Sequence, residues 1–263
     1  MKTTLDDSVF GSLDGNLEIR PFLPELLQDL WSLGSPPERS IALLKPLDLP
    51  PAATRVLDLG CGKGAVTVRL AAELGFSAVG VDGCAEFLET ARAKAGEFGV
   101  GSRCQFVLGD LREYVKKACD FDVAILAYVG DVLGGPRETV GRLRTCVRDG
   151  GYILIDDGYL RSGRVFHHYR PHDETVTELL SFGDVLLKEI ENTDDEIMEI
   201  NRSYLRDIRE RARGLAARRP GLGPLLKAYL KSQEEECALL TRHFRGATWL
   251  VRKGGGKNSK RMA

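Results

Sequence analysis

Hydrophobic and polar positions alternate in blocks along the middle of this chain, with glycines or prolines between the blocks. Short apolar runs with the length and branched side chains of buried strands occur at residues 55–59, 77–81, 103–108, 121–128 and 152–156. Apolar residues at helical spacing occupy segments between them, at 65–74, 84–98 and 138–147. This alternation predicts an α/β fold, a doubly wound and mostly parallel sheet with helices on both faces.

The pattern also predicts elements before and after this core. Residues 17–33 place apolar side chains on one helical face, and residues 40–47 suggest a second short helix. Residues 184–191 and 247–252 have the character of two more strands. Between these strands, two long helical patterns are separated by a break at Pro220–Gly221.

These elements suggest a division of the chain. We expect an N-terminal helical cap over residues 1–50 and a core built from residues 51–193 with 246–253. A helical hairpin at 194–245 is then inserted between the sixth and seventh strands, where it could close over a substrate, pair with a second copy as a homodimer, or only pack on the sheet. The tail at 254–263 is polar and rich in glycine, so we expect it to be disordered.

The run RVLDLGCGKG at residues 55–64 joins a predicted strand to a predicted helix through three glycines. Gly60, Gly62 and Gly64 allow a tight turn that brings bare backbone, and the unpaired N–H groups of the helix start, close to a ligand. The spacing is neither the G-x-G-x-x-G of nicotinamide and flavin folds nor the loop that binds nucleoside triphosphates. A turn that only packs the helix on the strand remains the alternative.

The sequence from Asp58 to Gly64 resembles the first motif of class I S-adenosylmethionine-dependent methyltransferases, an acid followed by alternating glycines. The resemblance implies that S-adenosylmethionine is the cofactor, that Gly60, Cys61, Gly62 and Gly64 line its site, and that Asp58 orders the loop. It also implies a seventh strand that runs antiparallel between the fifth and the sixth. In the family, leading helices often lie over the open edge of the site; here they could do so or only pack on the core without contacting a ligand.

Acids at the ends of the next two strands extend this site. Asp82, followed by Gly83, ends the second strand and could accept hydrogen bonds from both ribose hydroxyls. Asp110 follows the third strand; in the family an acid here accepts from the adenine amino group while a backbone N–H, here that of Leu111, meets the ring. Asp110 could instead cap the helix that begins at Leu111. Tyr128 ends the fourth strand, where its ring or carbonyl could lie beside the transferred methyl group.

Candidates on the substrate side come from the fourth and fifth strands and the loop beyond: Asp131, Asp157, Tyr159, His167 and His168. A histidine here could act as a general base, or the loop could be a polar surface crossover. Amino-methyltransferases of adenine or glutamine carry N/D-P-P-Y/F after the fourth strand, whereas this chain has AYVG. That difference argues against base-flipping chemistry.

Three of the acids at this edge also raise the question of a metal. Asp131, Asp156 and Asp157 resemble the magnesium-binding corners of catechol-type O-methyltransferases. Paired acids at a strand end are more often helix caps or partners of nearby arginines such as Arg161 and Arg164, and no further acid or asparagine completes an octahedral set. We therefore predict no metal.

Composition restricts the binding partners and the cellular compartment that we expect for this protein. A net charge of −1 and a pI near 6.5 do not suggest a protein that binds a phosphate backbone. The six cysteines are scattered without metal-ligand spacing, which indicates reduced thiols in a cytoplasmic protein. We find no signal peptide and no apolar run of membrane-spanning length.

These observations favour an enzyme that methylates a small molecule at oxygen, nitrogen or carbon. The first alternative is a protein that binds the cofactor without transferring a methyl group. The second is methylation of RNA or protein, because the predicted hairpin is rich in arginine. Acids alternate with these arginines, however, so ion pairs on a solvated helix face explain them better. The arginines are Arg202, Arg206, Arg209, Arg211, Arg213, Arg218 and Arg219.

Overall fold

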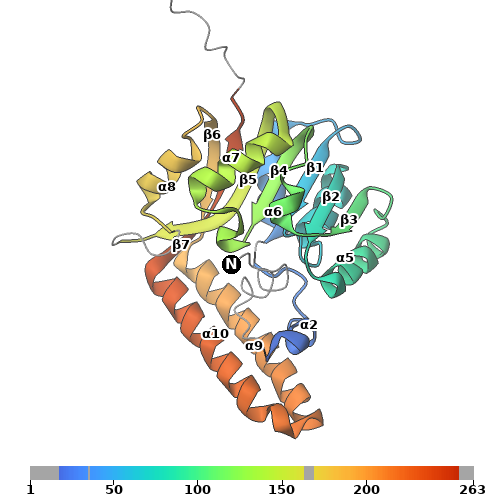
Figure 1. Ribbon diagram of the computed structural model, residues 1–263, viewed down its shortest axis with the longest axis vertical. Helices are drawn as coiled ribbons and strands as arrows, with labels where there is room; N and C mark the ends of the chain where they lie inside the picture. Colours follow the sequence, from blue (N-terminus) through green and yellow to red (C-terminus); the bar gives the residue numbers. More distant parts are fainter. Residues whose placement is uncertain (1–17, 35, 163–168, 255–263) are drawn as a thin grey trace, which may run out of the picture.

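The computed structural model describes residues 18–34, 36–162 and 169–254, and this part of the chain contains one seven-stranded sheet (Figure 1). The strands lie in the order β3-β2-β1-β4-β5-β7-β6, and β7 runs antiparallel to both of its neighbours while the other pairs are parallel. Their bounds are β1 Arg55–Leu59, β2 Ser77–Asp82, β3 Cys104–Leu108, β4 Phe121–Ala127, β5 Val147–Leu160, β6 Val185–Glu191 and β7 Phe244–Arg252. The predicted doubly wound sheet with an antiparallel last strand is confirmed.

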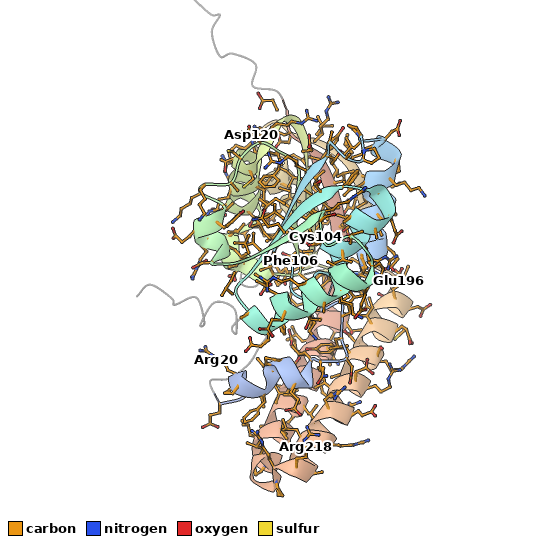
Figure 2. The ribbon with its side chains drawn as sticks, turned by 90° about the vertical axis from the view of Figure 1, so that its right-hand side faces the viewer. Arg20, Cys104, Phe106, Asp120, Glu196 and Arg218 are labelled. Atoms are coloured by element: carbon orange, nitrogen blue, oxygen red, sulfur yellow. The ribbon has the colours of Figure 1, made fainter. Side chains whose placement is uncertain are left out.

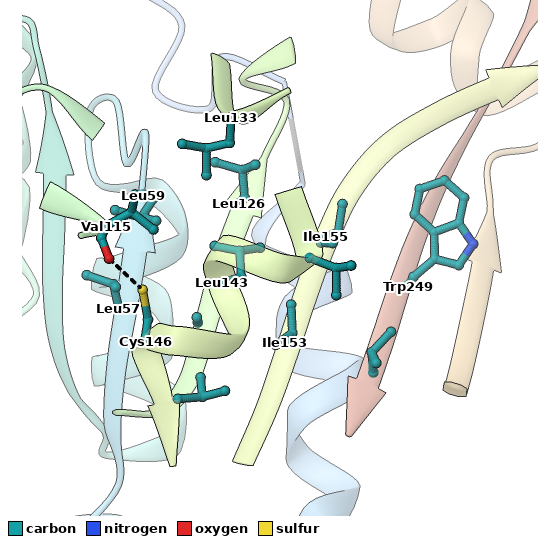
Figure 3. Close-up of a cluster of buried hydrophobic side chains, with 14 of the residues drawn as sticks. Leu57, Leu59, Val115, Leu126, Leu133, Leu143, Cys146, Ile153, Ile155 and Trp249 are labelled. Carbon is teal, nitrogen blue, oxygen red and sulfur yellow. Dashed lines mark hydrogen bonds between the residues drawn. The ribbon is translucent and has the colours of Figure 1, made fainter. Parts of the chain in front are cut away.

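Helices cover both faces of this sheet. On one face lie α3 (Pro37–Leu44), α4 (Ala65–Leu74) and α5 (Ala85–Glu97), and on the other lie α6 (Leu111–Tyr114), α7 (Pro136–Cys146) and α8 (His172–Leu179). Successive side chains of a strand point to opposite faces, so Leu57 and Leu59 pack under α7 while Val56 packs under α3 and α4. Figure 3 shows the α7 side, where the thiol of Cys146 donates to the carbonyl of Val115 at 3.6 Å.

The helical hairpin consists of α9 (Asp194–Arg218), the short turn η4 (Pro220–Leu222) and α10 (Gly223–His243). It projects from the edge of the sheet at which the parallel strands end, because it follows β6 and precedes the antiparallel β7 (Figure 1). Thr193 and Glu196 form a capping box that begins α9 beside the sheet, and Arg218 lies at the far end of the hairpin (Figure 2).

The predicted N-terminal helical face is not one helix. Within residues 18–34, the structure contains only η1 (Arg20–Phe22) and α2 (Leu23–Leu26), followed by turns. The apolar side chains are nevertheless buried as the pattern predicted, because they pack on the hairpin and on α5. A second short turn, η2 (Lys45–Leu47), follows α3.

The fifth strand is longer than the sequence suggested. It continues past Asp156, and Asp157 and Tyr159 pair with Ala247 and Arg245 of β7 instead of lying beyond the strand end. The loop after β4 forms the short turn η3 (Gly130–Leu133). His167, His168 and all of the predicted disordered tail except Gly254 lie outside the described residues. In the described part of the chain, no helix has both the length and the apolar character needed to span a bilayer.

Candidate functional site

A cavity of about 130 Å³ lies where β1, β2 and β4 end, and we call it the first cavity. The glycine turn and the acids of β1 and β2 form its floor, and residues 31–34 of the N-terminal segment form its outer wall. Six residues predicted for a cofactor site line this cavity together: Asp58, Gly60, Cys61, Gly62, Asp82 and Tyr128.

The backbone of the glycine turn explains its residue types. Gly60, Gly62 and Gly64 have φ values of 75°, 52° and 75°, which lie in the region that only glycine adopts readily. The N–H groups of Gly60 and Cys61 donate to the carbonyl of Val81 at 2.8 and 3.1 Å, which ties the turn to β2. A Cβ on Gly64 would lie 2.8 Å from Ala91 Cβ. Gly64 therefore lets α4 pack close to α5. It is not among the residues that line the first cavity, and its contact with a cofactor stays a prediction.

Two carboxylates are buried at the floor of the first cavity. Asp58 accepts a hydrogen bond of 2.5 Å from the Thr67 hydroxyl, and burial raises the pKa of Asp58 to about 6. Asp82 accepts from the backbone N–H groups of Gly62 at 2.8 Å and Cys84 at 2.9 Å. Burial raises the pKa of Asp82 as well, and these N–H groups oppose the rise. Each oxygen of a carboxylate has two lone pairs, so Asp82 can still accept from a ligand.

The residues predicted to hold an adenine ring lie near this cavity but do not line it. Gly109 donates to the carbonyl of Asp82, which places Asp110 beside the end of β2. The Asp110 carboxylate caps α6 by accepting from the Arg112 N–H and also pairs with the Arg112 guanidinium, which lowers its pKa. Asp110 thus caps α6, as the alternative interpretation predicted, and Leu111 is the first residue of this helix. Contact with a cofactor stays a prediction for Asp110, Leu111 and Gly83.

No sequence motif indicates the contacts that hold the outer wall of the first cavity. The ammonium group of Lys63, inside the glycine turn, donates to the carbonyls of Leu27 and Leu30, the latter at 2.9 Å. In return the Trp31 indole donates to the carbonyl of Lys63 at 2.9 Å. Burial lowers the pKa of Lys63 to about 8. We call residues 27–34 the covering segment, because these contacts fix it over the first cavity.

Tyr128 separates the first cavity from a second cavity of about 100 Å³ and lines both. Its backbone is left-handed, with a φ of 52°, and its N–H donates to the carbonyl of Asp156 at 2.8 Å. A Cβ on Gly246 would lie 2.9 Å from the Tyr128 hydroxyl and 3.0 Å from the Asn192 amide nitrogen. The ring is thus held across the gap between the sheet and the covering segment, with its hydroxyl against β7.

The second cavity lies between the sheet edge and the base of the hairpin. Asp157 of β5, Tyr169 and Asn192 provide polar groups, and residues of α9 and α10 provide an apolar wall. Asn192 is buried; its amide oxygen accepts from the guanidinium of Arg39, which also pairs with Glu196 at 3.3 Å. Asn192, Tyr169 and Arg39 were not among the predicted site residues, because none of them belongs to a recognisable motif.

Two other residues predicted on the substrate side, Asp131 and Tyr159, line neither the first nor the second cavity. Asp131 is exposed in η3 and lines neither cavity. Tyr159 is buried, points its hydroxyl at Glu191 and packs its ring edge-on against His172 at 4.8 Å. Both remain predictions as substrate contacts.

Among the described residues, three potential metal ligands come within 4.8 Å of one another in a single group, His172, Glu189 and Glu191. Existing hydrogen bonds account for this group, since Glu189 accepts from the Trp249 indole and Glu191 from Tyr159. The set Asp131, Asp156 and Asp157 does not form such a group.

Comparisons with known proteins agree with this architecture. A SAM-dependent methyltransferase from Geobacter sulfurreducens, solved with S-adenosyl-L-homocysteine, superimposes with a TM-score of 0.76 at 23% identity over 88% of this chain and 97% of that one. The uncharacterised protein YjhP of Escherichia coli is 33% identical over 111 residues, which is 41% of this chain and less than half of YjhP. The crystal structure of YjhP matches 87% of this chain and 98% of its own with a TM-score of 0.73 at 20% identity.

A protein with a different described activity shares the fold. The [4+2]-cyclase SpnF superimposes with a TM-score of 0.73 at 15% identity over 96% of this chain and 97% of its own. Residues 51–212, however, match a family described as the methyltransferase domain. The chain therefore belongs to the methyltransferase domain family, as the resemblance of its glycine motif to class I enzymes predicted.

Proposed function

We propose that this protein transfers a methyl group from S-adenosylmethionine to a small molecule. One observation carries the proposal: the glycine turn, Asp58 and Asp82 meet in a single cavity that shares a wall, Tyr128, with a second cavity. When bound, the cofactor supplies an electrophilic methyl group on a sulfonium sulfur. Two adjoining chambers can hold a donor and an acceptor in contact, and this proximity accounts for much of such catalysis.

The residues of the first cavity fit this cofactor chemically. The free lone pairs of Asp82 can accept from ribose hydroxyls, and the bare backbone of Gly60 and Gly62 allows close approach. Ionised Asp58 and Asp82 favour a cationic ligand. The covering segment limits the access of water. No general base is required if the acceptor reaches the site unprotonated.

Isothermal titration calorimetry with S-adenosylmethionine and S-adenosylhomocysteine tests the cofactor site. We expect Asp82→Ala to weaken both ligands at least about tenfold, because it removes the predicted ribose acceptor. Asp149→Ala is the control, since Asp149 is exposed at the opposite edge of the sheet. The absence of binding by the wild-type protein, or equal affinities of both variants, would refute the proposal.

A protein that binds the cofactor without methyl transfer is the second candidate, because the structural likeness extends to SpnF, whose described activity is cyclisation. Release of S-adenosylhomocysteine over a panel of metabolites separates the two functions. Tight binding with no release on any acceptor favours this candidate.

The arginines of the hairpin argue for a small acceptor over RNA. Five of them pair with acids of the same chain: Arg202, Arg206, Arg209, Arg211 and Arg218. Charges paired in this way are poor phosphate ligands.

A homodimer through the hairpin is also proposed, supported by the exposed side chains of Met198 and Leu239, and sedimentation velocity tests it. The six free thiols support a reducing, cytoplasmic location.

A further inference from the structure

We propose that the second cavity binds the methyl acceptor and selects a molecule with an apolar body and a hydrogen-bond donor that bonds to Asn201 of α9. The inference rests on the proposed function, because it assigns the acceptor side of the same site. Two features of the hairpin carry it: an apolar surface at its base, and an amide oxygen of Asn201 that accepts from none of the described residues.

The position of the second cavity suits an acceptor. Tyr128 and Gly34 line both cavities, and a Cβ on Gly34 would lie 2.7 Å from the Tyr128 Cβ, so only a thin wall separates the two spaces. The opposite side of the second cavity is the base of the hairpin, where α9 leaves the sheet (Figure 1). A molecule in this cavity therefore has the cofactor site at one end and the hairpin at the other.

The base of the hairpin gives the cavity an apolar surface. Ile197 and Ile200 of α9 and Leu240 of α10 line the cavity. The ring of Phe244 continues this surface where α10 ends and β7 begins. Ile200 keeps 36% of its surface exposed, and covering such a side chain with hydrocarbon stabilises a complex by about 25 cal/mol for each Å² removed from water. This surface predicts an acceptor with an apolar body, and the cavity volume of about 100 Å³ limits that body to a ring or a short chain.

Asn201 is a polar residue on this apolar side of the cavity. It lies one helical turn after Ile197, and its amide nitrogen donates across the hairpin to the Cys237 carbonyl at 3.4 Å and to the Thr241 hydroxyl at 3.0 Å. A carbonyl can only accept, so these contacts establish which end of the amide is the NH₂ group. The hairpin therefore uses the nitrogen of Asn201 and leaves its oxygen as the group that can accept from a ligand.

The oxygen of Asn201 accepts no hydrogen bond within the described part of the chain. It is not enclosed by protein either, because the buried polar atoms that lack a partner among these residues do not include it. Other polar side chains of the cavity wall bond within the chain: Tyr169 donates to Asp157, and Asn192 accepts from Arg39. A ligand O–H or N–H group that reaches Asn201 therefore gains a hydrogen bond without breaking one of the protein.

The course of α9 gives the acceptor a direction. The Tyr128 hydroxyl bonds with the side chain of Asn192, which lies just before the helix. Asn201 comes seven residues after Asp194, the first residue of α9, which is about 10 Å along the helix axis. The donor that bonds to Asn201 is therefore at the end of the acceptor away from the cofactor, and the atom that receives the methyl group is at the Tyr128 end.

Methyl transfer to such an acceptor balances without a further reactant. A lone pair on the reacting oxygen or nitrogen forms a bond to the methyl carbon, and the carbon–sulfur bond breaks with its electron pair on sulfur. This leaves the neutral thioether S-adenosylhomocysteine, and the hydrogen of the reacting O–H or N–H group leaves as a proton to water. The hydrogen bond to Asn201 is kept throughout, because it involves the other end of the molecule.

Acceptor binding can be measured without turnover. The protein is saturated with S-adenosylhomocysteine, and ligand-observed NMR compares 2-phenylethanol and isopentanol with 2-phenylethyl fluoride and isopentyl fluoride, which have the same skeletons but no O–H donor. We expect each alcohol to bind at least about threefold more tightly than its fluoride, as one hydrogen bond predicts. Ethanol lacks the apolar body and should bind at least about tenfold more weakly than isopentanol. Equal binding of alcohols and fluorides, or of ethanol and isopentanol, would overturn the inference.

Three variants locate the contacts. Asn201→Leu should abolish the preference for alcohols and retain fluoride binding. Thr241→Val is the matched control, because it removes a contact of Asn201 across the hairpin but keeps the Asn201 oxygen, so the preference should persist. Ile200→Trp fills the cavity and should weaken alcohols and fluorides alike. The assignment is refuted by a preference that survives Asn201→Leu, by its loss in Thr241→Val, or by unchanged binding in Ile200→Trp.

The failure of the proposed function gives a different result. If S-adenosylhomocysteine does not bind, the cofactor proposal fails, and titration of the unloaded protein with the same alcohols and fluorides still tests the preference of the cavity. If S-adenosylhomocysteine binds and the alcohols show no preference over the fluorides, only the acceptor inference fails.

Discussion

Burial determines how single carboxylates behave in the first cavity. Asp58 is surrounded by protein, and removal from water raises its pKa to about 6, although the Thr67 hydroxyl stabilises the ionised form. The nearby charge of Asp82 contributes to the rise. At pH 7.5 the carboxylate is ionised and attracts a cationic ligand, and this attraction is lost as the pH falls through 6.

This titration predicts a pH effect that depends on the charge of the ligand. Between pH 7.5 and 5.5 the ionised fraction of Asp58 falls about fourfold. We expect the Kd of S-adenosylmethionine to rise by up to about fourfold over this range, while that of S-adenosylhomocysteine, which lacks the sulfonium charge, changes less. Calorimetry at several pH values measures both constants. In Asp58→Asn the difference between the ligands should no longer vary with pH, and parallel curves for the wild type would contradict the mechanism.

Local sequence predicted those residues whose roles depend on their immediate neighbours. Gly60, Gly62 and Asp82 could be recognised because a strand end and a tight turn restrict the residue types there. Asn192 could not be recognised, because its role comes from Arg39 and Tyr128, which are far from it in the sequence. A buried amide between two such partners leaves no periodic pattern.

At the scale of elements, the N-terminal segment at residues 18–34 shows why a correct apolar pattern can predict the wrong helix. Ile19, Leu23 and Leu26 are buried as a helical face would be, yet α2 ends at Leu26. Prolines at positions 21 and 24 cannot donate helical hydrogen bonds. The carbonyls of Leu27 and Leu30 accept from Lys63, so a tertiary contact stabilises the turns that follow. The hairpin helices contain no proline beyond their first turn, and their pattern predicted them correctly.

The contact with Lys63 predicts a local effect of mutation. Lys63→Met keeps the apolar stem but removes the donor for two carbonyls, which should lower the free energy of unfolding by about 1–3 kcal/mol. Hydrogen exchange should accelerate in residues 27–34 and remain unchanged in β1 and β4. Lys116→Met, at an exposed site on the opposite face, is the control. Uniform acceleration over the whole chain would show global destabilisation instead.

At the scale of the whole molecule, three parts of the chain enclose the two cavities. The sheet supplies the acids, the N-terminal segment covers the first cavity, and the hairpin closes the second. The family match covers strands β1 to β6 and most of α9 but ends before α10 and β7. The parts that would distinguish one acceptor from another are therefore those for which the motifs gave least information.

The distribution of charge over the molecule predicts how activity responds to salt. The chain is nearly neutral, and most hairpin arginines are paired within the chain, so a small acceptor should bind without releasing counterions from a polyanion. We expect kcat/KM to change less than about threefold between 50 and 200 mM NaCl, whereas a protein with 6–10 phosphate contacts loses about 10³–10⁵ in affinity. Alanine at both Arg202 and Arg206, two exposed positions, should leave kcat/KM and its salt dependence unchanged. A steep salt dependence that this double variant reduces would instead indicate a nucleic-acid substrate bound along the hairpin.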